Sequence, residues 1–411
     1  MKTKTKTAAL PARSKTVFPR LPGQLIPVLI CVLGLAFCGR EEDNVEKIIE
    51  NGVEVTVNHL EPYNLKGEPQ TLTLERLLSI DTGDDAVAAA GIRDIYRFDV
   101  DAEGGIFILS PPVGKGNLIF RFSSEGHFLA SFGLMGQGPN EMEYPDDILT
   151  FGTDQVWITE SPKKKIHLFK KDGSAIAEKT LDPGFVSLVP LENGTYLVSR
   201  LIAENMQAKY FPIVLSLYDS DFKPVKELDR FSAYPNRIIA DTLQEKTICG
   251  TEFAFVGKAG GGRVYAGNSE RGYEVWVFDL GGRLLRKVRK GYTPVPVSEE
   301  YKKEYVKPYE EMMPEYAKKI YFPQHWHPFH SFFADDGGRL FVMTFEPGEN
   351  PGEHMFDVFN KDGILITRKS LNILHGGSGT LLARARGDRL YVLQEKPSGF
   401  KELVVYQMIW S

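Results

Sequence analysis

Three of the eight histidines in this 411-residue chain lie within six positions, in the stretch YFPQHWHPFHSFF. The spacing of His325, His327 and His330 would let one loop fold around a zinc or copper ion, because imidazole nitrogen binds both metals. Such a centre would support a metal-dependent hydrolase or lyase, for example a lactonase. The spacing assigns no Asp or Glu carboxylate to the three histidines as a further ligand. The alternative is therefore a structural loop in which His330 starts a strand.

A helical insert is predicted directly before the histidines. Ser298 is a favourable N-cap, and Glu299 and Glu300 follow it in what would be the first turn, where acidic side chains interact favourably with the helix dipole. Pro308 and Pro314 should limit the insert to short, bent helical pieces.

The insert carries an aromatic stripe. Tyr301, Tyr305 and Tyr309 are spaced four apart and share one face of a helix. Together with Trp326 and the three histidines, they are the residues that we expect to contact a protein, peptide or glycan. The alternative is that the tyrosines only pack the insert onto its neighbours.

A glycine-rich stretch, FGLMGQGPNEMEYP at residues 132–145, could instead bind phosphate. A phosphate loop needs converging backbone N–H groups before a helix, but Pro139 removes one of them, and Glu141 and Glu143 place negative charge there. The stretch is better interpreted as a connector whose prolines keep it out of a sheet.

Other candidates are weaker. Lys163, Lys164 and Lys165 fit a solvated hairpin tip, and Ser378 lacks the Gly-x-Ser-x-Gly setting of a nucleophile. His375 is a loop residue whose position the spacing does not determine. No catalytic residue is therefore assigned, and a binding role is favoured over an enzymatic one.

The elements that must position these residues are short repeated strands. In one type of segment a turn precedes an aromatic residue among aliphatic ones. Its six copies are 104–108, 154–158, 193–197, 262–265, 338–342 and 388–392. In the second type a strand ends on an aromatic residue and turns, mostly through Asp-Gly. Its copies are 122–126, 169–173, 218–221, 278–282, 359–363 and, at the end of the chain, Tyr406.

The two types of segment interleave without exception, so each unit holds at least two adjacent antiparallel strands. Six such units predict an all-β fold, a six-bladed β-propeller. The fourth and fifth units stand further apart, which places the insert, residues 294–330, between blades 4 and 5. Because the sequence ends before the last blade has an outer strand, Thr71–Ile80 is our candidate for that strand.

The N-terminus is predicted to be an export signal. Residues 1–24 carry six basic residues and no acidic one, and the apolar run Leu25–Phe37 follows. Leu35-Ala36-Phe37-Cys38 resembles the lipobox of bacterial lipoproteins, in which the cysteine is lipidated, although Phe37 replaces the usual small residue. Ordinary cleavage and an uncleaved anchor are the alternatives.

Charge excludes one class of partner. Removing residues 1–37 takes away six of the 49 basic residues and none of the 54 acidic ones. The mature chain is therefore acidic, which argues against nucleic acid as a partner.

Three features resemble one family: the run Val53–His59, the Gly-Gln-Gly-Pro-Asn-Glu connector and the Phe-x-x-Asp-Gly turns. They are similar to those of bacterial six-bladed β-propeller proteins, many of them lipoproteins and distantly related to NHL-repeat propellers. Asn140 departs from the glycine common in that connector. The resemblance implies the fold and an exported location, and it supplies no catalytic residues.

We therefore expect an export signal in residues 1–38 with lipidation at Cys38, a lead-in at 39–70 and a propeller at 71–411. The predicted function is a binding module of the cell envelope, held at a membrane in the periplasm or at the cell surface, with its partner at the insert-bearing face. No cofactor is expected unless the histidines bind zinc. The alternatives are the metal-dependent enzyme and a structural component of an envelope complex.

Overall fold

The computed structural model of the chain describes residues 45–111, 116–182, 184–202, 211–233, 248–249, 254–375 and 380–411. Cys38 and the predicted export signal lie outside these residues, and so does Ser378. Within the described ranges, no helix is both long and apolar enough to cross a membrane.

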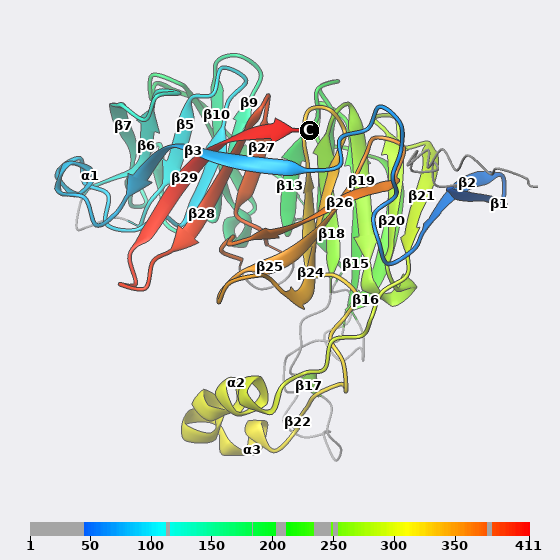
Figure 1. The fold of residues 1–411 in the computed structure, drawn as a ribbon. Helices are drawn as coiled ribbons and strands as arrows, with labels where there is room; N and C mark the ends of the chain where they lie inside the picture. The colour runs from blue at the N-terminus through cyan, green and yellow to red at the C-terminus, as the bar shows by residue number, and fades with distance from the viewer. Residues whose placement is uncertain are drawn as a thin grey trace, which may run out of the picture. The chain divides into compact units, whose positions relative to one another are not determined.

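The chain folds into a six-bladed β-propeller, as predicted (Figure 1). Blade 1 contains β4 (Arg97–Val100), β5 (Ile106–Leu109), β6 (Asn117–Phe122), β7 (Phe128–Met135) and β8 (Glu141–Met142). Blade 2 contains β9 (Asp147–Phe151), β10 (Gln155–Glu160), β11 (Lys165–Lys170) and β12 (Ala175–Thr180). Blade 3 contains β13 (Ser187–Pro190), β14 (Tyr196–Leu201), β15 (Phe211–Tyr218) and β16 (Pro224–Ala233).

The other three blades follow the same antiparallel order. Blade 4 contains β18 (Phe255–Gly260), β19 (Arg263–Asn268), β20 (Glu274–Asp279) and β21 (Leu284–Lys290), extended at its outer edge by β2 (Val53–Asn58) and β1 (Glu46–Glu50). Blade 5 contains β23 (Ser331–Ala334), β24 (Leu340–Pro347), β25 (His354–Phe359) and β26 (Leu365–Leu371). Blade 6 contains β27 (Ala383–Arg386), β28 (Arg389–Glu395), β29 (Lys401–Trp410) and β3 (Leu72–Asp81). The short helices outside the insert are α1 (Asp85–Ala89), η1 (Ser161–Lys163) and η2 (Ser269–Arg271).

The last blade is closed by a strand from the beginning of the propeller. β3 pairs antiparallel with β29, in a register that sets Leu72 opposite Trp410 and Ile80 opposite Leu403. The predicted closing strand is thereby confirmed. Pairing the two ends of the propeller gives blade 6 its fourth strand and closes the ring.

A repeated hydrogen-bond pattern forms the turns between strands. After β4 the Gly104 N–H donates to the Asp101 carbonyl, and the Asp101 carboxylate accepts from the N–H groups of Glu103 and Gly105. Gly104 has a φ of +84°, which glycine adopts without a steric penalty. Asp279 forms an equivalent turn in blade 4, so the Asp and Gly positions of the repeat have a direct structural cause.

The core is divided among the blade interfaces. Each interface holds one cluster of buried apolar side chains drawn from both neighbouring blades, six in all among the described residues. The aromatic residues of the repeat fill these clusters, as Phe107, Trp157 and Phe341 show, each at most 2% exposed. Since burial of apolar surface is the main source of stability, the aromatic repeat stabilises the contacts between blades.

The glycine-rich connector differs in one respect from its prediction. Glu141 and Met142 form β8, which pairs parallel with Leu134 and Met135 at the edge of blade 1. The prediction that the connector stays out of a sheet is therefore wrong, because its prolines flank these two residues and leave their own N–H groups available. A Glu141 carboxylate oxygen accepts the Gly138 N–H at 2.8 Å, so an acidic side chain of the chain itself occupies the place of a bound anion.

The insert between β21 and β23 contains α2 (Glu299–Met312), α3 (Pro314–Ala317) and β22 (Ile320–Tyr321), which pairs with β17 (Ile248–Cys249). Figure 1 shows both helices below the blades and apart from them. Ser298 caps α2 as predicted, since its hydroxyl accepts the Tyr301 N–H at 3.1 Å. The limit predicted at Pro308 is wrong, because α2 continues through it and ends only before Pro314, at the first position of α3.

Candidate functional site

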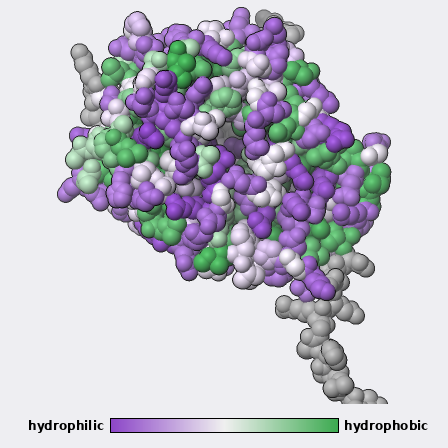
Figure 2. Space-filling view, turned by 90° about the horizontal axis from the view of Figure 1, so that it is seen from above, coloured by the Kyte–Doolittle hydropathy of each residue, from purple (hydrophilic) through white to green (hydrophobic). Residues whose placement is uncertain are grey.

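The first strands of the blades surround a central channel that holds a cavity of about 590 Å³. The cavity reaches the hairpin turns that follow these inner strands, at Ala102, Gly152 and Gly262 among others. We call this end of the channel the turn-side mouth. The opposite end, where the insert leads into β23, is the insert-side mouth. Figure 2 views the molecule from above and shows a hollow inside a mostly hydrophilic rim.

Two side chains of the cavity wall form an ion pair. The Arg384 Nε of β27 donates to the Asp99 carboxylate of β4 at 2.7 Å. The other Asp99 oxygen accepts from the backbone N–H of Thr150 at 2.7 Å and from its hydroxyl at 2.9 Å. Blades 6, 1 and 2 thus meet at one carboxylate, whose negative charge is compensated by this chain.

Lys258 of β18 faces the same cavity without such a partner. Among the residues that the structure describes, none makes a hydrogen bond or ion pair with its ammonium group. Burial and, after it, the positive charge of Arg384 lower the pKa of Lys258 to about 8, while the negative charge of Asp147 acts in the opposite direction. The channel therefore holds an amine that is mostly protonated at pH 7 and loses its proton more readily than an ordinary lysine.

Asp147 of β9 is another charged group of this wall, which also includes Glu192, Arg263, Asp336 and Arg386. One of its oxygens accepts the N–H of the next residue, Ile148, at 2.9 Å. Burial raises the pKa of the Asp147 carboxyl, although the positive charges of Arg384 and Arg97 oppose the shift. We refer to Asp99, Asp147, Lys258 and Arg384 as the channel charges.

The rest of the wall is partly apolar. Leu149, Leu188, Val189, Phe333 and Leu381 line the cavity beside the channel charges. A concave site with apolar walls and a few convergent polar groups is the usual form of a small-molecule site. Titratable groups with opposite pKa shifts in one cavity can also exchange protons with a bound molecule. The channel can therefore bind a small charged ligand and take part in proton transfer.

The predicted aromatic residues lie together on the insert. The ring centroids of Tyr301 and Trp326 are 4.6 Å apart, and Trp326 stacks on Phe345 of β24 at 4.6 Å. Tyr305 and Tyr309 are 5.7 Å apart on α2. The three tyrosines and Trp326 are half-buried. The rings thus form a continuous path from α2 to blade 5, consistent with the packing alternative.

The three predicted histidines are not brought together as a metal centre. His325 pairs with Pro296 in an isolated β-bridge, and His330 lies next to His375. The rings of His330 and His375 are 4.5 Å apart, and those of His354 and His375 are 5.2 Å apart. In the described part of the chain, no three His, Cys, Asp or Glu side chains are placed to hold a metal ion.

Sequence reasoning missed the channel charges because each lies on a different blade. One signal was present: each inner strand directly precedes the turn and aromatic residue of the first repeat type. A charged residue in that position, such as Asp99 or Lys258, is therefore expected to face the channel rather than solvent.

Residues 89–239 match the model of the family DUF5128, which is described as a 6-bladed beta-propeller. No curated protein matches the chain. Among solved structures, a candidate exported protein from Bacteroides fragilis is 12% identical, with a TM-score of 0.49, over 86% of this chain and all of that one. A member of the DUF4221 family from Bacteroides vulgatus is 11% identical, with a TM-score of 0.48, over 84% of this chain and all of that one.

The virginiamycin B lyase of Staphylococcus aureus is 11% identical, with a TM-score of 0.37, over 82% of this chain and all of that one. Similarity at this level carries no argument about activity. The class of the molecule is thus defined by its own fold and channel: a six-bladed β-propeller with a charged central cavity.

Proposed function

We propose that this chain is an exported binding protein whose ligand, a small molecule bearing a carboxylate, occupies the central channel. The observation that carries the proposal is Lys258, an amine that faces a cavity of about 590 Å³ and has no partner within the described residues. A desolvated charge without a counter-ion is costly, and a bound carboxylate would supply one.

Two further features support a carboxylate ligand. Arg384 donates through Nε to Asp99 and through one terminal nitrogen to the Ala383 carbonyl, while its second terminal nitrogen makes no hydrogen bond within the described residues. Arg97, from the same inner strand as Asp99, adds positive charge that acts on both Lys258 and Asp147. The ligand would enter through the turn-side mouth.

The proposed location rests on the sequence alone. The basic N-terminus and the apolar run Leu25–Phe37 support export, and Cys38 supports a lipid anchor at a membrane of the cell envelope. Incorporation of labelled palmitate in a bacterial host tests the anchor. Labelling that is lost in Cys38→Ser supports lipidation, and equal labelling of both proteins contradicts it.

Calorimetry with succinate as the probe tests the binding proposal. We expect saturable binding to the wild-type chain and at least a tenfold weaker affinity in Lys258→Met. Lys223→Met is the control, because the Lys223 side chain is 74% exposed and does not line the cavity. Equal affinity in all three proteins would remove Lys258 from the site.

A second candidate is a protein, peptide or glycan at the insert, as the sequence predicted. It is supported by the half-buried rings of Tyr301, Tyr305, Tyr309 and Trp326, with His325, His327 and His330 beside them. Stacking of aromatic rings on sugars and peptides is a common mode of recognition. A glycan array read with the wild type and with Tyr309→Ala would test it: binding that is insensitive to the substitution contradicts this site.

A further inference from the structure

We propose that Lys258 is a carbonyl-reactive amine, which captures a small 2-oxo acid in the channel as an imine while Arg384 holds the carboxylate and Asp147 transfers protons. The inference rests on the proposed function, because it requires the ligand to occupy the channel. It goes further in naming the chemical class of the ligand and a covalent step.

The first argument compares the ion pairing of Lys258 with that of two other lysines of the propeller. Lys171 is enclosed beside Asp101, with 2.7 Å between its Nζ and a carboxylate oxygen, and Lys290 lies 3.3 Å from Asp357. Both ammonium groups are therefore neutralised by the chain itself. Lys258 has no equivalent carboxylate at ion-pair distance within the described residues, so its nitrogen is accessible to a molecule in the cavity.

The second argument is the protonation state of that nitrogen. Only the neutral amine can attack a carbonyl group. With the pKa of Lys258 lowered to about 8, roughly a tenth of the amine is neutral at pH 7, against less than about a thousandth for an ordinary lysine. Burial and a neighbouring cation, here Arg384, are the two features that activate lysines for imine formation.

The third argument concerns the proton donor. Burial raises the pKa of Asp147, which lines the same cavity, and so favours its protonated form. A carboxylic acid can protonate the carbonyl oxygen under attack and later the departing hydroxyl group. The cavity thus combines a nucleophile with an acid–base group.

The step balances without any further reactant. The nitrogen lone pair forms a bond to the carbonyl carbon, and the oxygen takes a proton, which gives a carbinolamine. Asp147, which supplies that proton, takes one back from the nitrogen. It then protonates the hydroxyl group, which leaves as water, and takes the second proton of the amine as the carbon–nitrogen double bond forms. One amine and one carbonyl compound give one imine and one water, with no oxidation or reduction.

The Arg384 guanidinium selects among carbonyl compounds, because its second terminal nitrogen makes no hydrogen bond within the described residues. In a 2-oxo acid the carboxylate is attached to the reacting carbonyl carbon, so one molecule can contact Arg384 and Lys258 together. A simple aldehyde or a neutral sugar lacks the group that would pair with the guanidinium. The cavity volume of about 590 Å³ limits the ligand to small molecules.

Borohydride trapping tests the inference on the purified full chain. Pyruvate is the probe, sodium borohydride reduces any imine to a stable amine, and peptide mass mapping locates the adduct. We expect one main adduct, at Lys258. Lys258→Arg, which keeps the positive charge, should lose it, and the exposed control Lys223→Arg should retain it. Asp147→Asn should form the adduct at least tenfold more slowly.

The outcomes separate the two proposals. If succinate binds in the Lys258-dependent way described above but pyruvate leaves no adduct at Lys258, the binding proposal stands and imine formation is wrong. If Lys258→Arg is labelled as strongly as the wild type, or if labelling spreads evenly over surface lysines, the inference is overturned. Far-ultraviolet circular dichroism of each variant, with the succinate titration, verifies that a lost adduct does not reflect misfolding.

Discussion

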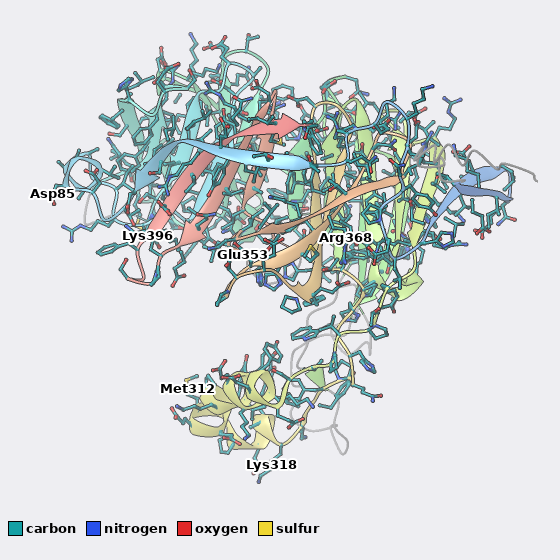
Figure 3. The ribbon with its side chains drawn as sticks, viewed as in Figure 1. Asp85, Met312, Lys318, Glu353, Arg368 and Lys396 are labelled. Carbon is teal, nitrogen blue, oxygen red and sulfur yellow. The ribbon has the colours of Figure 1, made fainter. Side chains whose placement is uncertain are left out.

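The interface between blades 4 and 5 and the central channel each enclose a lysine and a carboxylate, and they differ in how these are paired. At the interface, Asp357 accepts from Tyr273 at 2.6 Å and from Arg368 at 2.8 Å, and Lys290 lies 3.3 Å away. Arg368, labelled on β26 in Figure 3, also donates to Glu346 at 2.7 Å. Every charge in this network meets an opposite one.

Of the four channel charges, only two are paired in this way. Asp99 and Arg384 form an ion pair, whereas Lys258 and Asp147 have no ion-pair partner among the described residues. Pairing holds two blades together, and a lack of pairing leaves groups available to a ligand. Burial of a charge therefore does not indicate function by itself, and the completeness of its pairing is the more informative property.

The largest expected effect comes from breaking the paired network. Asp357→Ala should leave Lys290 enclosed without a counter-ion and destabilise the fold by about 3–5 kcal/mol. Urea unfolding measures the change. Asp221→Ala is the matched control, because Asp221 forms an exposed pair with Lys223 and should change stability by less than about 1 kcal/mol. A small effect of Asp357→Ala would contradict the distinction between the paired charges of the blade 4–5 interface and the unpaired charges of the channel.

Two histidines, His330 and His354, should make stability depend on pH. Burial lowers the pKa of His354 to about 4 and that of His330 to about 3. Below about pH 6.5 the unfolded chain binds protons that the folded chain does not, so their contribution is complete above pH 6.5 and falls as the pH falls towards 4. The loss should reach a few kcal/mol by pH 4.5.

Unfolding free energies at pH 7 and pH 4.5 measure this loss. Because carboxylates also titrate in this range, the comparison is with His354→Gln, which should lose about 1–2 kcal/mol less than the wild type over the same interval. An equal loss in both proteins would show that His354 is protonated in the folded state.

Substitution of two glycines distinguishes the effect of packing at a blade interface from the effect of backbone strain. Gly363 and Gly194 have φ values of +75° and +80°, but a Cβ on Gly363 would lie 2.6 Å from a methyl group of Val288, whereas one on Gly194 meets nothing within 4 Å. Gly363→Ala should therefore cost about 2–4 kcal/mol and Gly194→Ala about 1 kcal/mol. Thermal unfolding measures the loss of stability in both variants. Equal losses would mean that Val288 of blade 4 moves to accommodate the added methyl group.

The smallest effect has the opposite sign. Lys258→Met should stabilise the unliganded chain by about 1 kcal/mol, because it removes a partly desolvated charge that has no counter-ion. Stability of the wild type should also rise between pH 8 and 10.5, as the folded chain releases this proton before the unfolded chain does. Destabilisation by Lys258→Met in urea unfolding would place Lys258 with the paired, structural lysines.

The sequence by itself determined the repeat, the number of blades, the closing strand Thr71–Ile80 and the helix start at Ser298. These features depend on local chemistry: glycine at left-handed turns, aromatic residues at fixed distances from them, and a capping hydroxyl. The continuation of α2 through Pro308 and the pairing of Glu141 in β8 were missed, because neighbouring structure overrode local preference.

Only the tertiary structure decided which side chains meet. Asp99 and Arg384 are separated by 285 positions in the chain and form an ion pair, and His330 lies beside His375 rather than in a centre with His325 and His327. Closure of the ring brings the first strand of every blade to one axis. The distances between side chains of different blades depend on this closure, and no local sequence pattern predicts them. The candidate site therefore forms only when the ring closes, whereas the blades that form it can be predicted from the sequence.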